Sequence, residues 1–466
     1  MNDSHNTNHY DCIVVGGRPA GATLAARLGQ QGLRVLLLER AVLPSPPAAS
    51  SPVIYPATMR LLDEIGADEA EYARGTPRLR RFVAEVREDF RFTAAVPSLF
   101  GRDYIYAIDR ARFDAALWRT AAGQPGVVAH DGASVTDLLR DGERVTGVIW
   151  RADGLEQRAT AGCVVGADGR FSLVARKAGA HDCDERTDLP TTIYYAYWKG
   201  VAPYDGAEPI IHSFSAGRGY GILTMDSADG STAVVVEGRA AALELGDATA
   251  DELYLGLLRR HPRVWRRLAG ATLATDVRGM RNIGNKYRGA GGPGWALVGD
   301  ALHQKDPIDG QGIYDAVATA KLLATAIGDW RRGRMTWERA LEQYDAAVRA
   351  ETYAMYVETL ERVRRELYTG YSERAYRTWV RWLSTDREYQ RRLMLLLARG
   401  LPPTGWLPSS VFFGAIGRGA LADLARAIAR RPAPYAPCRW SRCYFDCFVC
   451  WASTCCTWVC GEAAVP

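Results

Sequence analysis

The 466-residue sequence contains few lysines and, over most of its length, few cysteines. Only five of its 58 basic residues are lysine, and basic and acidic residues are interleaved along the chain. No stripe of positive charge is therefore expected to bind nucleic acid. Three cysteines, Cys12, Cys163 and Cys183, precede residue 438. So low a number excludes a disulfide framework for the main body and favours a reducing, cytoplasmic location.

Several enzyme signatures are also absent. The opening stretch MNDSHNTNH has no apolar core, so no secretory signal is expected. The sequence contains no Ser-His-Asp pattern, no H-E-x-x-H helix and no P-loop, so hydrolase and metalloprotease chemistry has no support and no metal site is expected. Its 48% hydrophobic and 24% charged residues are typical of a soluble globular enzyme with two or three structural units.

A glycine-rich turn near the beginning of the chain predicts a nucleotide site. The buried strand of residues 11–17 runs into VVGGRPAG, a helix follows to Gly32, and a second apolar strand ends at Glu39 and Arg40. This order is typical of a βαβ unit that holds a pyrophosphate at a helix N-terminus, and the terminal acid favours FAD or NAD over NADP. The residues of the turn are Gly16, Gly17, Arg18, Ala20 and Gly21.

Arg18 occupies the position of the middle glycine of the G-x-G-x-x-G pattern. Its side chain either points outward into solvent, or its guanidinium joins the phosphate cluster.

Two later segments repeat the pattern of a strand, a loop and a helix. Residues 162–180 form a strand that ends at Asp168 and Gly169, with a helix starting near Ser172. Residues 294–327 form a strand that delivers Asp300, and then a P-x-x-G-x-G loop leads into another helix. The loop and helix start contain Pro307, Gly310, Gln311, Gly312 and Ile313.

In this order and spacing, the three segments resemble the FAD-binding signatures of the single-component flavoprotein monooxygenases, the para-hydroxybenzoate hydroxylase-like superfamily. That superfamily also contains geranylgeranyl reductase-like and flavin-halogenase branches. The resemblance covers roughly residues 10–330 and implies an α/β fold. A Rossmann-type FAD-binding domain with a parallel sheet would be formed by residues 10–77, 100–185 and 276–335.

The remaining segments complete the predicted architecture. Period-two alternation in residues 186–275, together with 78–99, predicts an antiparallel sheet. The resemblance implies that this sheet lies over the cofactor and holds the substrate pocket. Residues 336–435 have long charged helical faces and predict C-terminal helices.

The resemblance also implies roles for individual residues. Glu39, beside Arg40, would bind the adenosine ribose, and the backbone at Val135 would meet the adenine. Arg110 would open a helix near the cofactor, and Asp168 would organise the pyrophosphate region.

At the other end of FAD, Asp300 would contact the ribityl chain. The loop from Pro307 through Gly310–Ile313 would place backbone N–H groups against the flavin pyrimidine edge. A helix N-terminus stabilises the negative charge of reduced flavin, which gives this placement a physical reason.

Candidates for contacting the substrate are less sharply defined. His212 and His303 are candidate acid–base groups, and His303 is the stronger because it follows Asp300 near the expected flavin. Tyr195 and Tyr220 lie on the aromatic-rich strands of the predicted sheet, where each also suits an ordinary core position.

The resemblance predicts an FAD-dependent oxidoreductase, foremost a monooxygenase that hydroxylates or epoxidises a small aromatic or polyketide-like metabolite. NADPH or NADH would reduce the flavin, and O₂ would then form a flavin C4a-hydroperoxide. The alternatives are a reductase of isoprenoid double bonds, a halogenase, disfavoured because no W-x-W-x-I-P segment occurs, and a flavin-binding protein without turnover.

A cysteine-rich tail forms residues 436–466 and contains seven of the ten cysteines. A metal knuckle has little support because the spacing matches no standard pattern. The tail also fits weak interfacial attachment to a membrane, or a segment without function.

Overall fold

The computed structural model describes residues 9–47, 51–87, 90–206, 208–369 and 373–429. The chain divides into two units, residues 1–416 and 417–466, and the fold described below is that of the first. The cysteine-rich tail, for which membrane attachment was one interpretation, lies outside the described residues.

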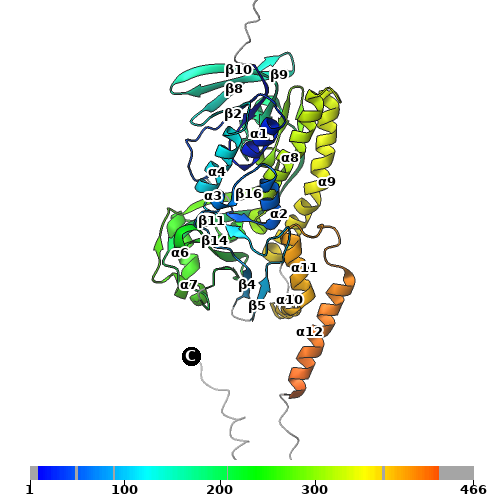
Figure 1. The fold of residues 1–466 in the computed structure, drawn as a ribbon. Helices are drawn as coiled ribbons and strands as arrows, with labels where there is room; N and C mark the ends of the chain where they lie inside the picture. Colours follow the sequence, from blue (N-terminus) through cyan, green and yellow to red (C-terminus); the bar gives the residue numbers. More distant parts are fainter. Residues whose placement is uncertain (1–8, 48–50, 88–89, 207, 370–372, 430–466) are drawn as a thin grey trace, which may run out of the picture. The chain divides into compact units, whose positions relative to one another are not determined.

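One half of the first unit is built on a parallel sheet (Figure 1). Its parallel strands have the order β18-β10-β1-β2-β7, and the short strand β17 (Gly291–Gly292) adds an antiparallel edge. Helices α1, α4 and α8 pack against it with their apolar faces. The bounds are β1 (His9–Val15), β2 (Val35–Leu38), β7 (Val127–His130), β10 (Leu155–Gly166), β18 (Trp295–Leu297), α1 (Pro19–Gln30), α4 (Arg110–Ala122) and α8 (Gly312–Arg331).

Strand β10 has two pairing partners along its length. Its first half pairs antiparallel with β9 (Arg144–Ala152), which in turn pairs with β8 (Ser134–Asp141). Its second half pairs parallel with β1, where the continuous apolar run of each strand is buried. The strand ends immediately before Ala167 and Asp168, at the same edge of the sheet as the glycine turn.

The other half is a nine-stranded sheet with the order β19-β16-β11-β14-β13-β12-β4-β5 and with β15 beside β11. Its neighbours are antiparallel except β12 and β4, which run parallel. The bounds are β4 (Arg81–Val86), β5 (Phe90–Ala95), β11 (Asp182–Lys199), β12 (Ile210–Ser215), β13 (Tyr220–Asp226), β14 (Ser231–Arg239), β15 (Thr272–Leu273), β16 (Arg278–Arg288) and β19 (His303–Gln304).

This sheet extends beyond the segments predicted for it. The predicted FAD-binding domain includes residues 182–185 and 278–288. In the structure these residues lie in β11 and β16, which pair with each other. Strand β16 reads RGMRNIGNKYR, where charged residues and glycines obscure the alternation that marked the other strands.

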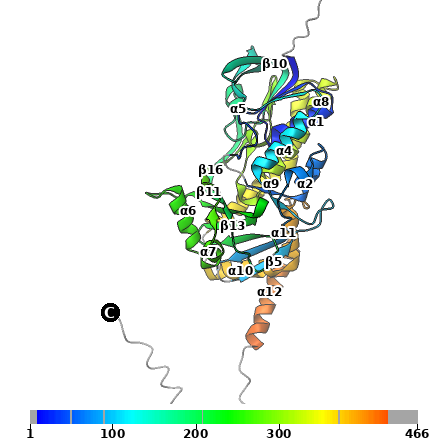
Figure 2. The same cartoon turned by 60° about the vertical axis from the view of Figure 1, so that its left-hand side comes forward.

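The two faces of the antiparallel sheet differ in what covers them. Ile193, Tyr195 and Val235 belong to a core on the face that also includes residues of α11 (Arg387–Leu397). The opposite face packs against α6 (Ala250–Arg259) and α7 (Pro262–Leu268), which lie beside β11, β13 and β14 in Figures 1 and 2.

The remaining helices confirm the predicted helical character of the C-terminal part. They are α9 (Trp337–Val363), α10 (Glu373–Thr385), α11 and α12 (Ser409–Ala429), with the short π-helical turn η5 (Arg364–Tyr368) after α9. None of the helices in the described ranges is long and apolar enough to cross a membrane. Short elements complete the unit: β3 (Val53–Ile54), α2 (Pro56–Asp63), α3 (Glu69–Tyr72), β6 (Tyr106–Ala107) and α5 (Leu173–Ala178).

Candidate cofactor and substrate site

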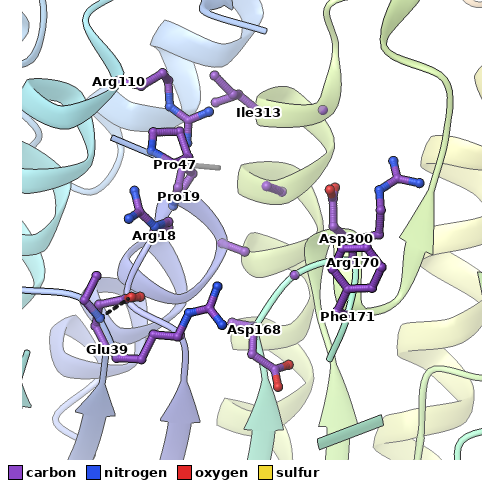
Figure 3. Close-up of a pocket in the computed structure, with 18 of the residues that line it drawn as sticks. Arg18, Pro19, Glu39, Pro47, Arg110, Asp168, Arg170, Phe171, Asp300 and Ile313 are labelled. Carbon is purple, nitrogen blue, oxygen red and sulfur yellow. Dashed lines mark hydrogen bonds between the residues drawn. The ribbon is translucent and has the colours of Figure 1, made fainter. Parts of the chain in front are cut away.

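A cavity of about 860 Å³ lies at the carboxyl ends of the parallel strands and is closed on one side by β11 and β16. In Figure 3, Glu39 and Arg18 lie on one side of it, and Asp300, Arg170 and Phe171 lie on the other. The predicted cofactor residues that line this cavity are Gly16, Arg18, Ala20, Glu39, Arg40, Arg110, Val135, Asp168, Asp300, Pro307, Gly310, Gly312 and Ile313. The structure therefore brings together residues from all three sequence segments.

The glycine turn leaves no room for side chains. Gly16 has φ +103°, and a Cβ there would lie 2.4 Å from the carbonyl oxygen of Ala167. A Cβ at Gly21, in the first turn of α1, would lie 1.8 Å from the carbonyl oxygen of Gly16. Gly17 and Gly21 do not line the cavity. Gly21 lets the turn and α1 approach each other, and Gly17 leaves room for the Trp118 ring and Glu39.

Glu39 fixes the turn to the end of β2. Its side chain is buried, Oε2 accepts a hydrogen bond from Gly17 N at 2.8 Å, and Oε1 accepts one from Ala41 N at 3.0 Å. A carboxylate has about four acceptor positions, so both oxygens keep capacity for the hydroxyls of a ribose in the cavity.

Arg18 lines the cavity, but its guanidinium is held by protein groups. Nη1 lies 2.6 Å from Asp114 Oδ2, and the two terminal nitrogens donate to Ser45 O and Oγ, each at 3.1 Å. Arg110 contacts the same buried carboxylate, with Nη2 3.0 Å from Asp114 Oδ1. Two guanidinium groups thus share one carboxylate, which leaves a net positive charge beside α1.

Asp168 organises the end of β10 through hydrogen bonds to the next helix. Its carboxylate accepts from Ser172 Oγ at 2.5 Å, Leu173 N at 2.6 Å and Val174 N at 3.2 Å, so it caps the start of α5. Burial raises the pKa of Asp168, although these hydrogen bonds oppose the shift.

The third segment forms the opposite wall. Asp300 follows β18 and is exposed to the cavity. Gly310 has φ +63°, which allows the loop to reverse before α8 begins at Gly312. The first N–H groups of α8 have no partners within the helix, and Gly312 and Ile313 line the cavity. Gln311 does not line it, because its side chain donates to Leu397 O at 3.0 Å.

His303 lies in the same wall and is the candidate acid–base group that the structure places at the cavity. Its ring is 3% exposed and stacks on Tyr287 with 5.1 Å between centroids. Among the described residues, neither ring nitrogen has a hydrogen-bond partner. Burial lowers the pKa of His303, so the neutral ring is favoured at pH 7.

A charged cluster next to His303 was not foreseen. Lys305 Nζ lies 2.6 Å from Asp315 Oδ2, Arg399 Nη2 lies 2.8 Å from Asp315 Oδ1, and all three side chains are buried. Burial lowers the pKa of Lys305, and the charge of Asp315 opposes this shift. Lys305 and Asp306 belong to the segment GDALHQKDP (residues 299–307), so their closeness to His303 and Pro307 was a usable signal.

Other cavity residues were also missed. Arg170 and Phe171 directly follow Asp168 and Gly169, and this adjacency could have identified them. The apolar wall formed by Ile193, Met280 and Ile283 depends on the pairing of β11 with β16, which no local pattern reveals.

The structure does not bring the three predicted substrate residues to the cavity. His212 is buried in β12, where its Nδ1 lies 3.4 Å from Arg267 Nη1 and its Nε2 lies 3.8 Å from Glu85 Oε2. Tyr220 Oη bonds His261 Nε2 at 2.7 Å on the face covered by α6 and α7. Tyr195 is a core residue two positions beyond the cavity-lining Ile193.

These observations fit FAD. The turn that would meet a pyrophosphate is open only because Gly16 and Gly21 lack a Cβ, and His303 presents buried nitrogens with no partner in the described chain. Helices α1 and α8 both begin at the cavity wall, where their N-termini favour negative charge.

A parallel sheet with this glycine turn, and an antiparallel sheet closing the cavity, are the architecture of a nucleotide-binding α/β protein. The chain belongs to the FAD binding domain family, whose sequence model matches residues 9–358. The resemblance and the fold class inferred from the sequence are thereby confirmed, and so is the FAD-dependent oxidoreductase class.

Its relatives have several activities. A 6-methylpretetramide 4-monooxygenase of Streptomyces rimosus is 28% identical over 74% of this chain and 81% of that protein. A tryptophan 2-halogenase of Chondromyces crocatus is 28% identical over 71% of this chain, but the match spans only 63% of the halogenase. A digeranylgeranylglycerophospholipid reductase of Methanocella arvoryzae is 25% identical over 73% of this chain and 83% of the reductase.

Solved structures agree on the fold. The myxobacterial chondrochloren halogenase CndH has a TM-score of 0.67 and 25% identity, with 87% of this chain and 99% of that chain covered. The flavin-dependent brominase Bmp2 has a TM-score of 0.70 and 20% identity, with 90% and 100% covered.

Proposed function

We propose that the protein is an FAD-dependent monooxygenase that uses NADPH or NADH and O₂ to hydroxylate or epoxidise a small aromatic or polyketide-like metabolite in the cytoplasm. The observation that carries the proposal is the cavity of about 860 Å³, in which the three predicted cofactor segments meet an apolar wall of the second sheet. The similarity to the pretetramide monooxygenase over most of both chains supports the same reaction class.

Bound FAD would supply the redox chemistry, and the chain would bind and orient the reactants. Glu39 would hold the ribose, and the turn around Gly16 would hold the pyrophosphate. Asp300 and the start of α8 would hold the flavin end. Ile193, Met280 and Ile283 would bind an apolar substrate and exclude water from the reacting atoms. His303, whose ring is neutral when its pKa is lowered, would accept or donate one proton at a bound ligand.

The experiment is a turnover assay of the purified protein reconstituted with FAD. With an aromatic polyketide acceptor, we expect substrate-stimulated oxidation of NADPH or NADH and one atom from ¹⁸O₂ in the product. Turnover without oxygen that saturates an isoprenoid double bond would overturn this proposal in favour of a reductase. Halide-dependent product formation would indicate a halogenase, and failure to bind FAD would overturn the flavoenzyme function altogether.

A further inference from the structure

Two carboxyl groups, one buried and one half-buried, lie together at the edge of the cavity. Asp306 follows β19, lines the cavity and is 1% exposed. Glu237 lies on β14 directly opposite Ile193 of β11, which is also a cavity residue. The two side chains are within hydrogen-bonding contact of each other. We refer to Glu237 and Asp306 as the carboxyl pair.

The two members of the pair have different surroundings. Asp306 accepts hydrogen bonds from Thr191 Oγ1 and, at 3.0 Å, from Ile308 N, and its own N–H donates to Asn285 Oδ1 at 2.6 Å. Oε1 of Glu237 is buried and has no hydrogen-bond partner among the described residues. Two carboxylates in contact cannot both ionise without strong repulsion, so the contact itself requires a proton.

The charges around the pair do not remove that requirement. Asp309, on the short turn Pro307–Asp309, adds negative charge, while Arg362 of α9 opposes it but is shared between Asp309, at 2.5 Å, and Glu366, at 2.9 Å. The hydroxyl of Tyr368 also lies nearby and donates to Pro190 O, and Lys305, which directly precedes Asp306, is paired with Asp315. Burial, and then the charge of Asp306, raises the pKa of Glu237 well above its usual range.

A second observation links the pair to a ligand. His303 lies three residues before Asp306, lines the same cavity and has two buried nitrogens without partners in the described chain. The same wall therefore contains both a proton-sharing acid and an unsatisfied group, which is the arrangement expected where a ligand takes up a proton.

We propose that the carboxyl pair of Glu237 and Asp306 keeps one proton at neutral pH and donates it, through Asp306, to the ligand bound in the cavity. This rests on the proposed function, because the conversion of substrate, O₂, NAD(P)H and H⁺ into hydroxylated substrate, NAD(P)⁺ and water consumes one proton beyond the hydride. An O–H bond of the pair breaks, an O–H bond forms on an oxygen of the ligand, and the electron pair remains on Asp306. The pair then regains a proton from water.

Infrared spectroscopy of the holoenzyme in H₂O and D₂O tests the shared proton without turnover. At pH 7 we expect a protonated carboxyl band that moves in D₂O, disappears in Glu237→Gln and persists in Glu85→Gln. Glu85 is the matched control because it is a buried carboxylate held by His212 and Tyr204, away from the cavity. A wild-type protein without the band, or a band retained in Glu237→Gln, would overturn the proposal. If Glu237→Gln does not fold, Asp306→Asn takes its place: loss of the band supports the carboxyl pair, and a retained band overturns the proposal.

Two further measurements test the contact with the ligand. Reducing the bound FAD with dithionite should shift or remove the band, and an unchanged band would contradict a donor that faces the cavity. In turnover, Asp306→Asn should lower kcat about 100-fold with KM nearly unchanged, while Glu85→Gln should keep both. A protein that binds no FAD has no flavin absorbance, so failure of the proposed function is distinguished from failure of the carboxyl pair.

Discussion

Two buried histidines of this protein lie in opposite kinds of surroundings. His212 lies 3.4 Å from Arg267 of α7 and 3.8 Å from Glu85 of β4, and its Nε2 has no hydrogen-bond partner among the described residues. His303 stacks on Tyr287 at the cavity, and its nitrogens have no partner in the described chain. Both are nearly inaccessible, at 1% and 3% exposure. Burial therefore does not separate the two histidines; they differ in that His303 lines the cavity and has both nitrogens without a partner in the described chain.

The largest expected effect is the loss of bound FAD from the cavity, with the surroundings of His212 unchanged. Gly16→Val places a side chain against the Ala167 carbonyl in a backbone conformation with φ +103°, so we expect bound FAD to be lost. Flavin absorbance after reconstitution measures this loss. The control is Gly32→Ala, which also has a positive φ of +80° but open space around its Cβ, and it should retain FAD. A folded Gly16→Val protein with the full flavin content would contradict the assigned turn.

Matched substitutions of the two histidines sharpen the comparison directly. His303→Asn should lower kcat about 100-fold, because a proton-transferring group at the cavity is removed. His212→Asn should leave kcat per folded molecule unchanged. Steady-state oxidation of NAD(P)H with saturating acceptor gives both values, and equal losses in the two variants would remove the functional distinction.

Alanine variants of the same two histidines are expected to differ in stability in the opposite sense. Removing the His212 ring leaves Glu85 and Arg267 buried with fewer partners, so His212→Ala should lower the free energy of unfolding by about 2 kcal/mol. Urea unfolding at pH 7 measures this change, with His303→Ala as the comparison. A larger loss in His303→Ala would mean that the ring at the cavity is the structural one.

The Glu85 cluster also predicts a pH dependence. Burial alone would raise the pKa of Glu85, but the nearby His212 ring and the hydrogen bond from Tyr204 outweigh it and lower the pKa to about 2. An unfolded glutamate titrates near pH ~4.3, so the stabilisation is complete above that pH and declines as the pH falls towards 2. The stability difference between wild type and Glu85→Gln, followed by urea unfolding, should shrink over that window. A difference that grows on acidification would contradict this assignment.

Arg18→Gly is expected to have the smallest effect. Because the guanidinium is held by Asp114 and Ser45, its removal should leave FAD bound with an affinity within about threefold of wild type. Titration with FAD, with Arg18→Lys beside it, measures the change. A tenfold or greater loss in Arg18→Gly would show that the guanidinium contributes to phosphate binding.

The sequence predicted the strand-end residues of this cavity better than its apolar wall. The glycine turn, Glu39, Asp168 and Asp300 lie at the ends of strands, and a local pattern of strand, loop and helix places such residues at one edge of a parallel sheet. The apolar wall was not predictable in this way, because Ile193 and Met280 meet only through the pairing of two distant strands. His212 resembled a site residue because no pattern in the sequence shows that Arg267, 55 positions away, contacts it.

Arg18 illustrates the same limit at a single position. The turn could be recognised despite the missing glycine, yet the direction of the guanidinium depends on Asp114, which lies 96 residues further along the chain. The carboxyl pair is a similar case, since Glu237 meets Asp306 only after β14 has paired with β11.

The most direct measurement of the central claim is the crystal structure of the protein with FAD. The account predicts the adenosine at Glu39 and Val135, the pyrophosphate at the turn around Gly16, and the flavin edge at Gly312 and Ile313 beside His303. FAD bound outside this cavity, or bound in it with adenine at the start of α8, would contradict the account.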